Sequence, residues 1–157
     1  MPDRLNQALE RSAGWCIAGG AAIFIGALLP WISNTASDGY AVVNSGGRAW
    51  SVIFGLILTG LGIAVHRWIN SAAAPHGKAK RPAAAVLILS SLGILGYGIF
   101  TVAGLVGFQE QTDYGYQVAV TYSPNIGLVL IMAGCVAAAI GSTRILAHAG
   151  SRAHVLG

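Results

Sequence analysis

The side chains that could do acid–base or metal chemistry are few in this chain, and the sequence scatters them. The histidines fall in predicted loops and tails, at His66, His76, His148 and His154. Metal sites need clustered His, Cys, Asp or Glu side chains, yet no histidine lies near the acids Glu110 and Asp113. A weak divalent-ion contact by these two acids is the alternative to solvated loop residues. We expect neither a metal site nor a cofactor, and we predict that the protein is not an enzyme.

The candidate nucleophiles also lack a base. The sequence has no nucleophile elbow, phosphate-binding loop or dinucleotide fingerprint. Ser90 and Ser91 lie in an apolar stretch and are expected to bond to backbone carbonyls or to a neighbouring helix. Tyr97, in the same stretch, is expected to form a hydrogen bond across the bundle; contact with a lipid or quinone ring is the alternative. Cys16 and Cys135 are expected to be small apolar residues at different depths rather than a disulfide.

Four apolar runs must position these residues, and none of them contains Asp, Glu, Lys, Arg or His. They cover residues 13–32, 50–65, 83–107 and 126–143. A helix of about 20 apolar residues crosses a hydrocarbon core of about 30 Å. The chain is 55% hydrophobic and 9% charged, whereas soluble domains carry about 25% charged residues. We therefore predict an all-α membrane protein, an antiparallel bundle of four transmembrane helices. Its transmembrane domain covers residues 13–143, with helices at about 13–32, 50–67, 83–107 and 124–143.

The basic residues predict how this bundle is oriented. Eight of the nine lysines and arginines fall in the N-terminal tail, the loop between the second and third helices, or the C-terminal tail; only Arg48 lies elsewhere. By the positive-inside rule, both tails, residues 1–12 and 144–157, are cytoplasmic. The N-terminal tail is compatible with a short helix at the membrane surface or with a frayed end. The first apolar run exceeds the about 7–15 residues of a signal-peptide core, so we expect a retained helix.

Tryptophans bracket the first two predicted helices. Trp15 and Trp31 are about 24 Å apart along a helix, and Trp50 and Trp68 about 27 Å apart. These separations approach the thickness of the hydrocarbon core, which favours interfacial anchors in the two aromatic belts. Packing inside the bundle is the alternative.

A basic cluster lies between the second and third predicted helices. It comprises Lys78, Lys80 and Arg81. We interpret the cluster as a topology determinant; contact with anionic lipid head groups is the alternative. The distribution of charge gives no reason to expect a nucleic-acid partner.

The two loops on the other side of the membrane carry strand signals. Residues 116–122 alternate strictly, with Tyr116 and Tyr122 on the same face. Residues 40–43 form a weaker strand pattern. We predict a small extracytoplasmic β-containing cap on the helix ends. The candidate partner contacts there are Tyr40, Arg48, Tyr114, Tyr116 and Tyr122.

Small residues recur at four-residue spacing in three of the predicted helices. The ladders are Ala18, Ala22, Gly26; Ser51, Gly55, Thr59; Ala133, Ala137, Gly141; and Gly134, Ala138, Ser142. Small residues let helix backbones approach closely in a membrane, where lipid supplies no hydrophobic drive between helices. We expect seams within the bundle; a dimer face is the alternative.

Leu29, Pro30 and Trp31 close the first predicted helix and precede a short Gly/Ser-rich loop and a Gly-rich return helix. This arrangement resembles a loose family of small four-helix integral membrane proteins of high-GC Gram-positive bacteria, with a Leu-Pro-Trp at the outer end of the first helix. The resemblance implies a bacterial plasma membrane and a subunit role, and it transfers no catalytic residues.

These observations together predict a non-enzymatic accessory or structural subunit of a larger membrane complex. Its partners are expected to be other integral membrane proteins and membrane lipids. A small oligomeric transporter or channel subunit is the alternative, and it requires a polar lining. The candidates for such a lining are Ser51, Thr59, Ser90, Ser91, Tyr97 and Thr101.

Overall fold

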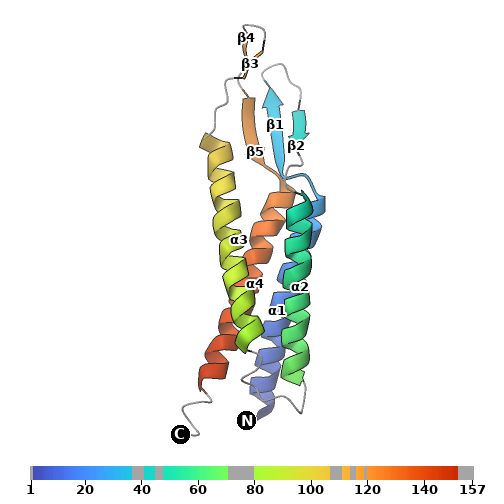
Figure 1. Cartoon of the computed structure of the whole chain (residues 1–157), viewed down its shortest axis with the longest axis vertical. Coiled ribbons are helices and arrows are strands. Elements are labelled where there is room, and N and C mark those ends of the chain that lie inside the picture. Colours follow the sequence, from blue (N-terminus) through green and yellow to red (C-terminus); the bar gives the residue numbers. More distant parts are fainter. Residues whose placement is uncertain are drawn as a thin grey trace.

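The fold is an antiparallel bundle of four long helices with short strands at one end (Figure 1). The computed structural model describes residues 2–36, 41–44, 48–70, 80–106, 111–113, 116–118 and 120–151. The helices are α1 (Pro2–Leu28), α2 (Arg48–Asn70), α3 (Lys80–Val106) and α4 (Ile126–Ser151). We call the end of the bundle that carries the strands the strand end. Helix α1 begins and α4 ends at the opposite end.

All four helices are long and apolar enough to cross a membrane. The spans are Gln7–Leu28, Ala49–Asn70, Lys80–Val102 and Ile126–His148. Each has the about 20 residues that a bilayer requires. The chain is therefore a multi-pass membrane protein, and the predicted four-helix bundle is confirmed.

Glycines bring α1 into backbone contact with α4. A Cβ atom added at Gly19 would lie 2.5 Å from the carbonyl oxygen of Gly134, and one at Gly134 would lie 2.5 Å from that of Gly19. The predicted ladder Gly134, Ala138, Ser142 is buried, and a Cβ at Gly19 would also meet Ala138. This ladder is therefore a seam within the bundle rather than a dimer face. Close backbone approach supplies the packing that lipid does not.

Helix α2 packs on the other side of α1, whereas α3 is the least buried helix. A Cβ at Gly20 would meet Thr59, and one at Gly55 would meet the backbone of Phe24. Within the most apolar part of each span, 44% of the residues of α1 and α4 are buried, but 28% in α2 and 22% in α3. The core therefore lies between α1 and its two neighbours, and the helix pair α2 and α3 is more open.

The first helix differs from its predicted bounds at both ends. Helix α1 runs without a break from Pro2, so the N-terminal tail forms one continuous helix with the first span. It ends at Leu28, before Pro30, which cannot donate a helical hydrogen bond. Backbone amides at the start of α4 donate hydrogen bonds to carbonyl oxygens of the segment that follows α1. Gly127 N donates to Pro30 O (3.0 Å), and Asn125 N donates to Trp31 O (2.7 Å). Helix α4 likewise extends to Ser151, eight residues beyond the predicted end at 143.

The described residues at the strand end form five short strands: β1 (Ile32–Ala36), β2 (Ala41–Asn44), β3 (Gln111–Asp113), β4 (Tyr116–Val118) and β5 (Val120–Pro124). An antiparallel sheet has the order β2-β1-β5, and β3 pairs with β4 separately. In the sheet, Ile32 of β1 lies opposite both Asn44 and Pro124. A cap outside the cell remains a prediction.

Two strand expectations need correction. Residues 116–122 were predicted as a single strand, but they are divided between β4 and β5, which have different partners. No strand was predicted for residues 32–36, yet they form β1, the central strand of the sheet. Pairing on both sides makes this segment extended, and its own residue pattern does not reveal that.

Candidate functional site

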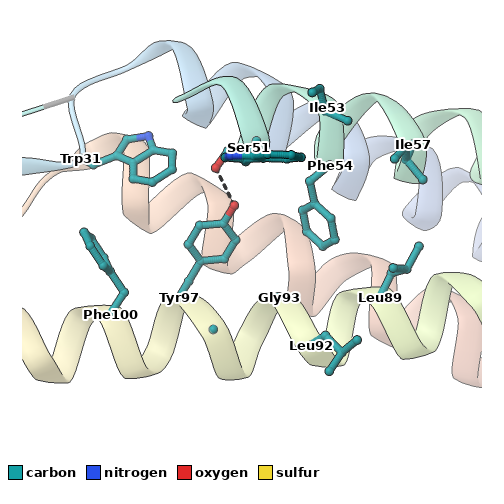
Figure 2. Close-up of a pocket in the computed structure, with 12 residues that line it drawn as sticks. Trp31, Ser51, Ile53, Phe54, Ile57, Leu89, Leu92, Gly93, Tyr97 and Phe100 are labelled. Atoms are coloured by element: carbon teal, nitrogen blue, oxygen red, sulfur yellow. Dashed lines mark hydrogen bonds between the residues drawn. The ribbon is translucent and has the colours of Figure 1, made fainter. Parts of the chain in front are cut away.

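A groove of about 670 Å³ runs between α2 and α3 and is open on one side (Figure 2). Figure 1 shows these two helices diverging toward the strand end. The groove is lined by Trp31, Trp50, Ser51, Ile53, Phe54, Ile57, Leu89, Leu92, Gly93, Gly96, Tyr97 and Phe100. Small-molecule sites in proteins are mostly apolar clefts of about 300–1,000 Å³. The groove has the size and the lining of such a site.

Two glycines of α3 shape the groove in different ways. A Cβ added at Gly93 would lie 2.8 Å from Cys135 Sγ and 3.0 Å from the ring of Phe54. Gly93 therefore lets α3 pack against α4 and lets the Phe54 ring reach α3. A Cβ added at Gly96 would meet nothing within 4 Å. The missing side chain of Gly96 thus leaves free space in the groove.

Aromatic rings gather at the strand end of the groove. Trp31 contacts Tyr97 edge to face, with ring centroids 5.8 Å apart and an interplanar angle of 81°. It contacts Phe100 similarly, at 6.4 Å and 80°. Phe54 lies 6.4 Å from Tyr97 on the other side. Such arrangements contribute about 0.5–1.5 kcal/mol per pair beyond burial, so the rings form a defined wall.

The segment after α1 fixes the position of Trp31. Its indole Nε1 donates a hydrogen bond of 3.1 Å to the carbonyl oxygen of Gly26, near the end of α1. Only 4% of the Trp31 side chain is exposed. The indole N–H is therefore satisfied within the protein, and the ring presents carbon atoms to the groove.

A hydroxyl pair provides one polar group in the groove. The side-chain oxygens of Ser51 and Tyr97 are 2.6 Å apart, and either can be the donor (Figure 2). This bond joins α2 to α3 across the groove, and it confirms the cross-bundle hydrogen bond expected for Tyr97. The hydroxyl pair lies beside the aromatic rings, whereas Ile57, Leu89 and Leu92 line the other half. The groove is therefore amphipathic along its length.

The other hydroxyls proposed as a polar lining do not join this pair. Thr59 donates to Gly55 O (2.8 Å), Ser90 to Leu87 O (3.1 Å) and Thr101 to Tyr97 O (2.7 Å). Each of these hydroxyls is bound to the backbone of its own helix. The remaining candidate, Ser91, is exposed on α3. In the described part of the chain these residues do not form a common polar path.

Both cysteines are free and buried in the bundle. The Sγ of Cys16 donates a weak hydrogen bond of 3.8 Å to Ala138 O. Cys135 packs where α3 approaches at Gly93. The expectation of small core residues without a disulfide is confirmed. Among the residues that the structure describes, no three His, Cys, Asp or Glu side chains come together as metal ligands do.

The four predicted tryptophan anchors differ in their surroundings. Trp15, Trp50 and Trp68 are 48%, 77% and 40% exposed, which suits rings in contact with lipid. Trp31 is buried, so it packs within the protein. This agrees with the alternative given for the tryptophans, packing inside the bundle. The neighbours of Trp31 at the end of α1 and on α3 surround the ring.

The described lining of the groove includes none of the predicted partner and lipid contacts. Tyr40, Tyr114 and Lys78 lie outside the described residues. The other predicted contacts are placed by their backbone or exposure: Arg48 is the first residue of α2, Tyr116 is in β4, Tyr122 is in β5, Lys80 begins α3, and Arg81 is exposed.

Sequence reasoning did not find the groove. The sequence feature that could have indicated the groove is the series of glycines in the third apolar run, residues 83–107, close to Tyr97 and Phe100. A glycine in a helix either lets a neighbouring helix pack closely against it or leaves empty space on the helix surface. The sequence does not show which of the two occurs, because that depends on where the neighbouring helices lie. Gly93 lets neighbouring residues pack closely against α3, and Gly96 leaves empty space.

Comparison of the chain with protein-family models, with curated proteins and with solved structures gave no match.

Proposed function

We propose that the protein is a non-enzymatic membrane protein that binds one lipid molecule in the groove between α2 and α3. The single observation that carries this proposal is the groove itself, about 670 Å³ in volume and lined by apolar and aromatic side chains. Because the lining helices are apolar enough to span a membrane, the molecules that reach its open side are lipids. The Ser51–Tyr97 pair at one end suits an amphiphile with a polar head and an apolar tail.

The placement of this groove in the cell is part of the proposal. The positive-inside distribution of lysine and arginine supports cytoplasmic ends for α1 and α4 in a bacterial plasma membrane. The strand end then lies outside the cytoplasm, the strands form the predicted cap there, and the groove opens to the outer leaflet. The resemblance to small Leu-Pro-Trp membrane proteins supports the same location.

Two glycines of α3 offer a matched test. Gly96 lines the groove and Gly98 does not, and a Cβ at either position would meet nothing within 4 Å. Gly96→Leu should fill the groove without a backbone clash, and Gly98→Leu makes the same change outside it. The protein and both variants would be purified in mild detergent, and the lipid retained by each would be counted by native mass spectrometry.

We expect one retained lipid for the unmodified protein and for Gly98→Leu, and none for Gly96→Leu. An unmodified protein without bound lipid contradicts the proposal. So does a Gly96→Leu protein that retains as much lipid as the Gly98→Leu protein. Circular dichroism would confirm that both variants remain helical.

The second candidate function is an accessory subunit of a larger membrane complex. The observation that favours it is the open face of α3, where Ile88, Leu95, Ile99 and Val102 are exposed and Gly98 leaves room for close approach. A transmembrane helix of a partner protein could pack on such a surface, with the outer tyrosines as further contacts. Co-purification of a larger membrane protein from native membranes supports this role, and isolation of a lone monomer counts against it. A transporter or channel subunit would instead require solute flux in liposomes.

A further inference from the structure

We propose that the end of the bundle opposite the strands carries a second lipid site, where Arg11 of α1 and Arg144 of α4 together bind the phosphate of an anionic phospholipid. The site is separate from the groove and goes beyond the function proposed above. Charge is the first observation that favours it. Among the side chains that the structure describes at this end, Glu10 is acidic and five are lysine or arginine. The basic residues are Arg11, Arg67, Lys80, Arg81 and Arg144.

Close packing of α1 against α4 brings two of these arginines to the same height. A Cβ added at Gly141 would lie 2.5 Å from the carbonyl oxygen of Ser12 and 3.0 Å from the Cβ of Trp15. Gly141 is therefore level with these two residues of α1. Arg144 lies three residues beyond Gly141, and Arg11 directly precedes Ser12. Because the two helices are antiparallel, both arginines lie about 4 Å past this contact, at about 1.5 Å per residue.

Burial shows that the two arginines share the outer side of the α1–α4 pair. Ser12 is 3% exposed and Ile145 is 1% exposed, so both face the inside of the bundle. Arg11, Trp15 and Arg144 are exposed instead. The axes of packed helices are about 8–10 Å apart, so two arginine side chains on the same side can reach one phosphate placed between them.

The guanidinium groups of this pair are available to a ligand. Arg11 and Arg144 are exposed, and among the described residues neither forms an ion pair with an acid. Glu10 is next to Arg11 in the sequence, but it points about 100° away around the helix. A guanidinium can bind a phosphate through two parallel hydrogen bonds. The pair therefore offers charge and geometry that suit a phosphate.

The neighbours of the arginines favour a lipid as the source of this phosphate. Trp15 lies one turn from Arg11, and Ile140 lies one turn from Arg144, in both cases toward the middle of the membrane. Their side chains are 48% and 41% exposed, and residues four apart share a helix face. Tryptophan rings are typical of the head-group level. A phospholipid held at the arginines would lay its acyl chains along Trp15 and Ile140, whereas a soluble phosphate would not use these surfaces.

This second lipid differs from the groove lipid in how firmly it is held. Arg11 and Arg144 lie on the open surface of the bundle, so a phospholipid bound there exchanges with the surrounding bilayer and is lost during purification in detergent. The one lipid expected to remain after purification is therefore the one in the groove. The arginine site has to be measured in a bilayer.

Trp15 can report on this site by fluorescence. A protein carrying Trp50→Phe and Trp68→Phe keeps Trp15 as its exposed tryptophan, with Trp31 as a buried background. It would be reconstituted into bilayers of phosphatidylcholine that contain increasing fractions of either brominated phosphatidylglycerol or brominated phosphatidylcholine. Bromine quenches a tryptophan that the lipid contacts. We expect phosphatidylglycerol to be preferred at Trp15 by at least about fivefold, the effect of one basic residue at an anionic surface.

Substitution of single arginines tests whether the pair holds one phosphate. In the Trp15 reporter protein, Arg11→Gln and Arg144→Gln should each remove most of the preference for phosphatidylglycerol. The double variant should lose little more, because groups that share one ligand are not additive. Arg81→Gln is the matched control, since it removes the same charge from an exposed position of α3 at the same end. It should leave the preference at Trp15 unchanged.

The outcomes distinguish this site from general attraction and from the groove. Equal quenching of Trp15 by the two brominated lipids overturns the proposal. A loss in Arg81→Gln as large as that in Arg11→Gln also overturns it, because overall positive charge would then explain the preference. Gly96→Leu, which fills the groove, should leave the preference at Trp15 unchanged, so the two lipid sites fail or hold independently. Circular dichroism would confirm that the variants remain helical.

Discussion

The two cysteines show how burial sets reactivity at the scale of single residues. Cys16 and Cys135 have no exposed surface, and their thiols lie among apolar side chains of the bundle. Thiols react only where a reagent can reach them, and burial opposes that access. The location of the two cysteines in apolar runs was enough to predict that they are buried. It was not enough to predict which residues surround each of them. The contact of Cys135 with the α3 backbone at Gly93 depends on how α3 packs.

We therefore predict that neither cysteine reacts with a maleimide in the folded protein. Mass spectrometry should show no added label in mild detergent and two labels after denaturation in SDS. Gln7→Cys, at an exposed position near the start of α1, serves as the control and should be labelled at once in the folded protein. Labelling of the native cysteines at the rate of this control would mean that the bundle is more open than described.

The helices of this bundle approach one another unequally closely. Helices α1 and α4 meet at backbone distance through Gly19 and Gly134, whereas α2 and α3 leave a groove and are joined by the Ser51–Tyr97 bond. The four-residue spacing of small residues was sufficient to predict seams. It was not sufficient to predict which helices they join, because that depends on the rotation of each helix about its axis.

The α1–α4 seam predicts contrasting effects for two substitutions in the same helix. Gly19→Ala places a Cβ against the backbone of α4 and should destabilise the bundle by about 1–3 kcal/mol, as overpacking does. Gly14→Ala adds a Cβ with nothing within 4 Å, so it should be neutral or stabilise α1 through better helix propensity. Unfolding in mixed micelles of increasing SDS content, followed by circular dichroism, measures both. Equal stabilities would contradict the close approach at Gly19.

The whole molecule is organised by its alternating spans. With four spans, the start of α1 and the end of α4 lie on the same side of the membrane, and the strands that follow α1 and α3 lie on the other. Length and hydropathy establish the number of spans, and the basic residues predict which side is cytoplasmic.

The predicted orientation can be tested with reporter fusions. Green fluorescent protein fused to the end of the full chain should fluoresce, and alkaline phosphatase at the same position should be inactive, because both would remain in the cytoplasm. As a control, alkaline phosphatase fused after Ala36, which follows one span, should be active. The reverse pattern of activities would require the opposite orientation, and it would place the groove in the inner leaflet.

The sequence by itself determined the four membrane spans and the apolar character of their central parts, because a bilayer imposes a length and a polarity on any single helix that crosses it. The groove, its amphipathic lining and the central place of β1 were decided only by the tertiary structure. Trp31, Ser51 and Tyr97 come from three separate segments, and β1 pairs with strands from both loops. Such neighbours depend on helix rotation, crossing and register, which the pattern of one segment does not encode.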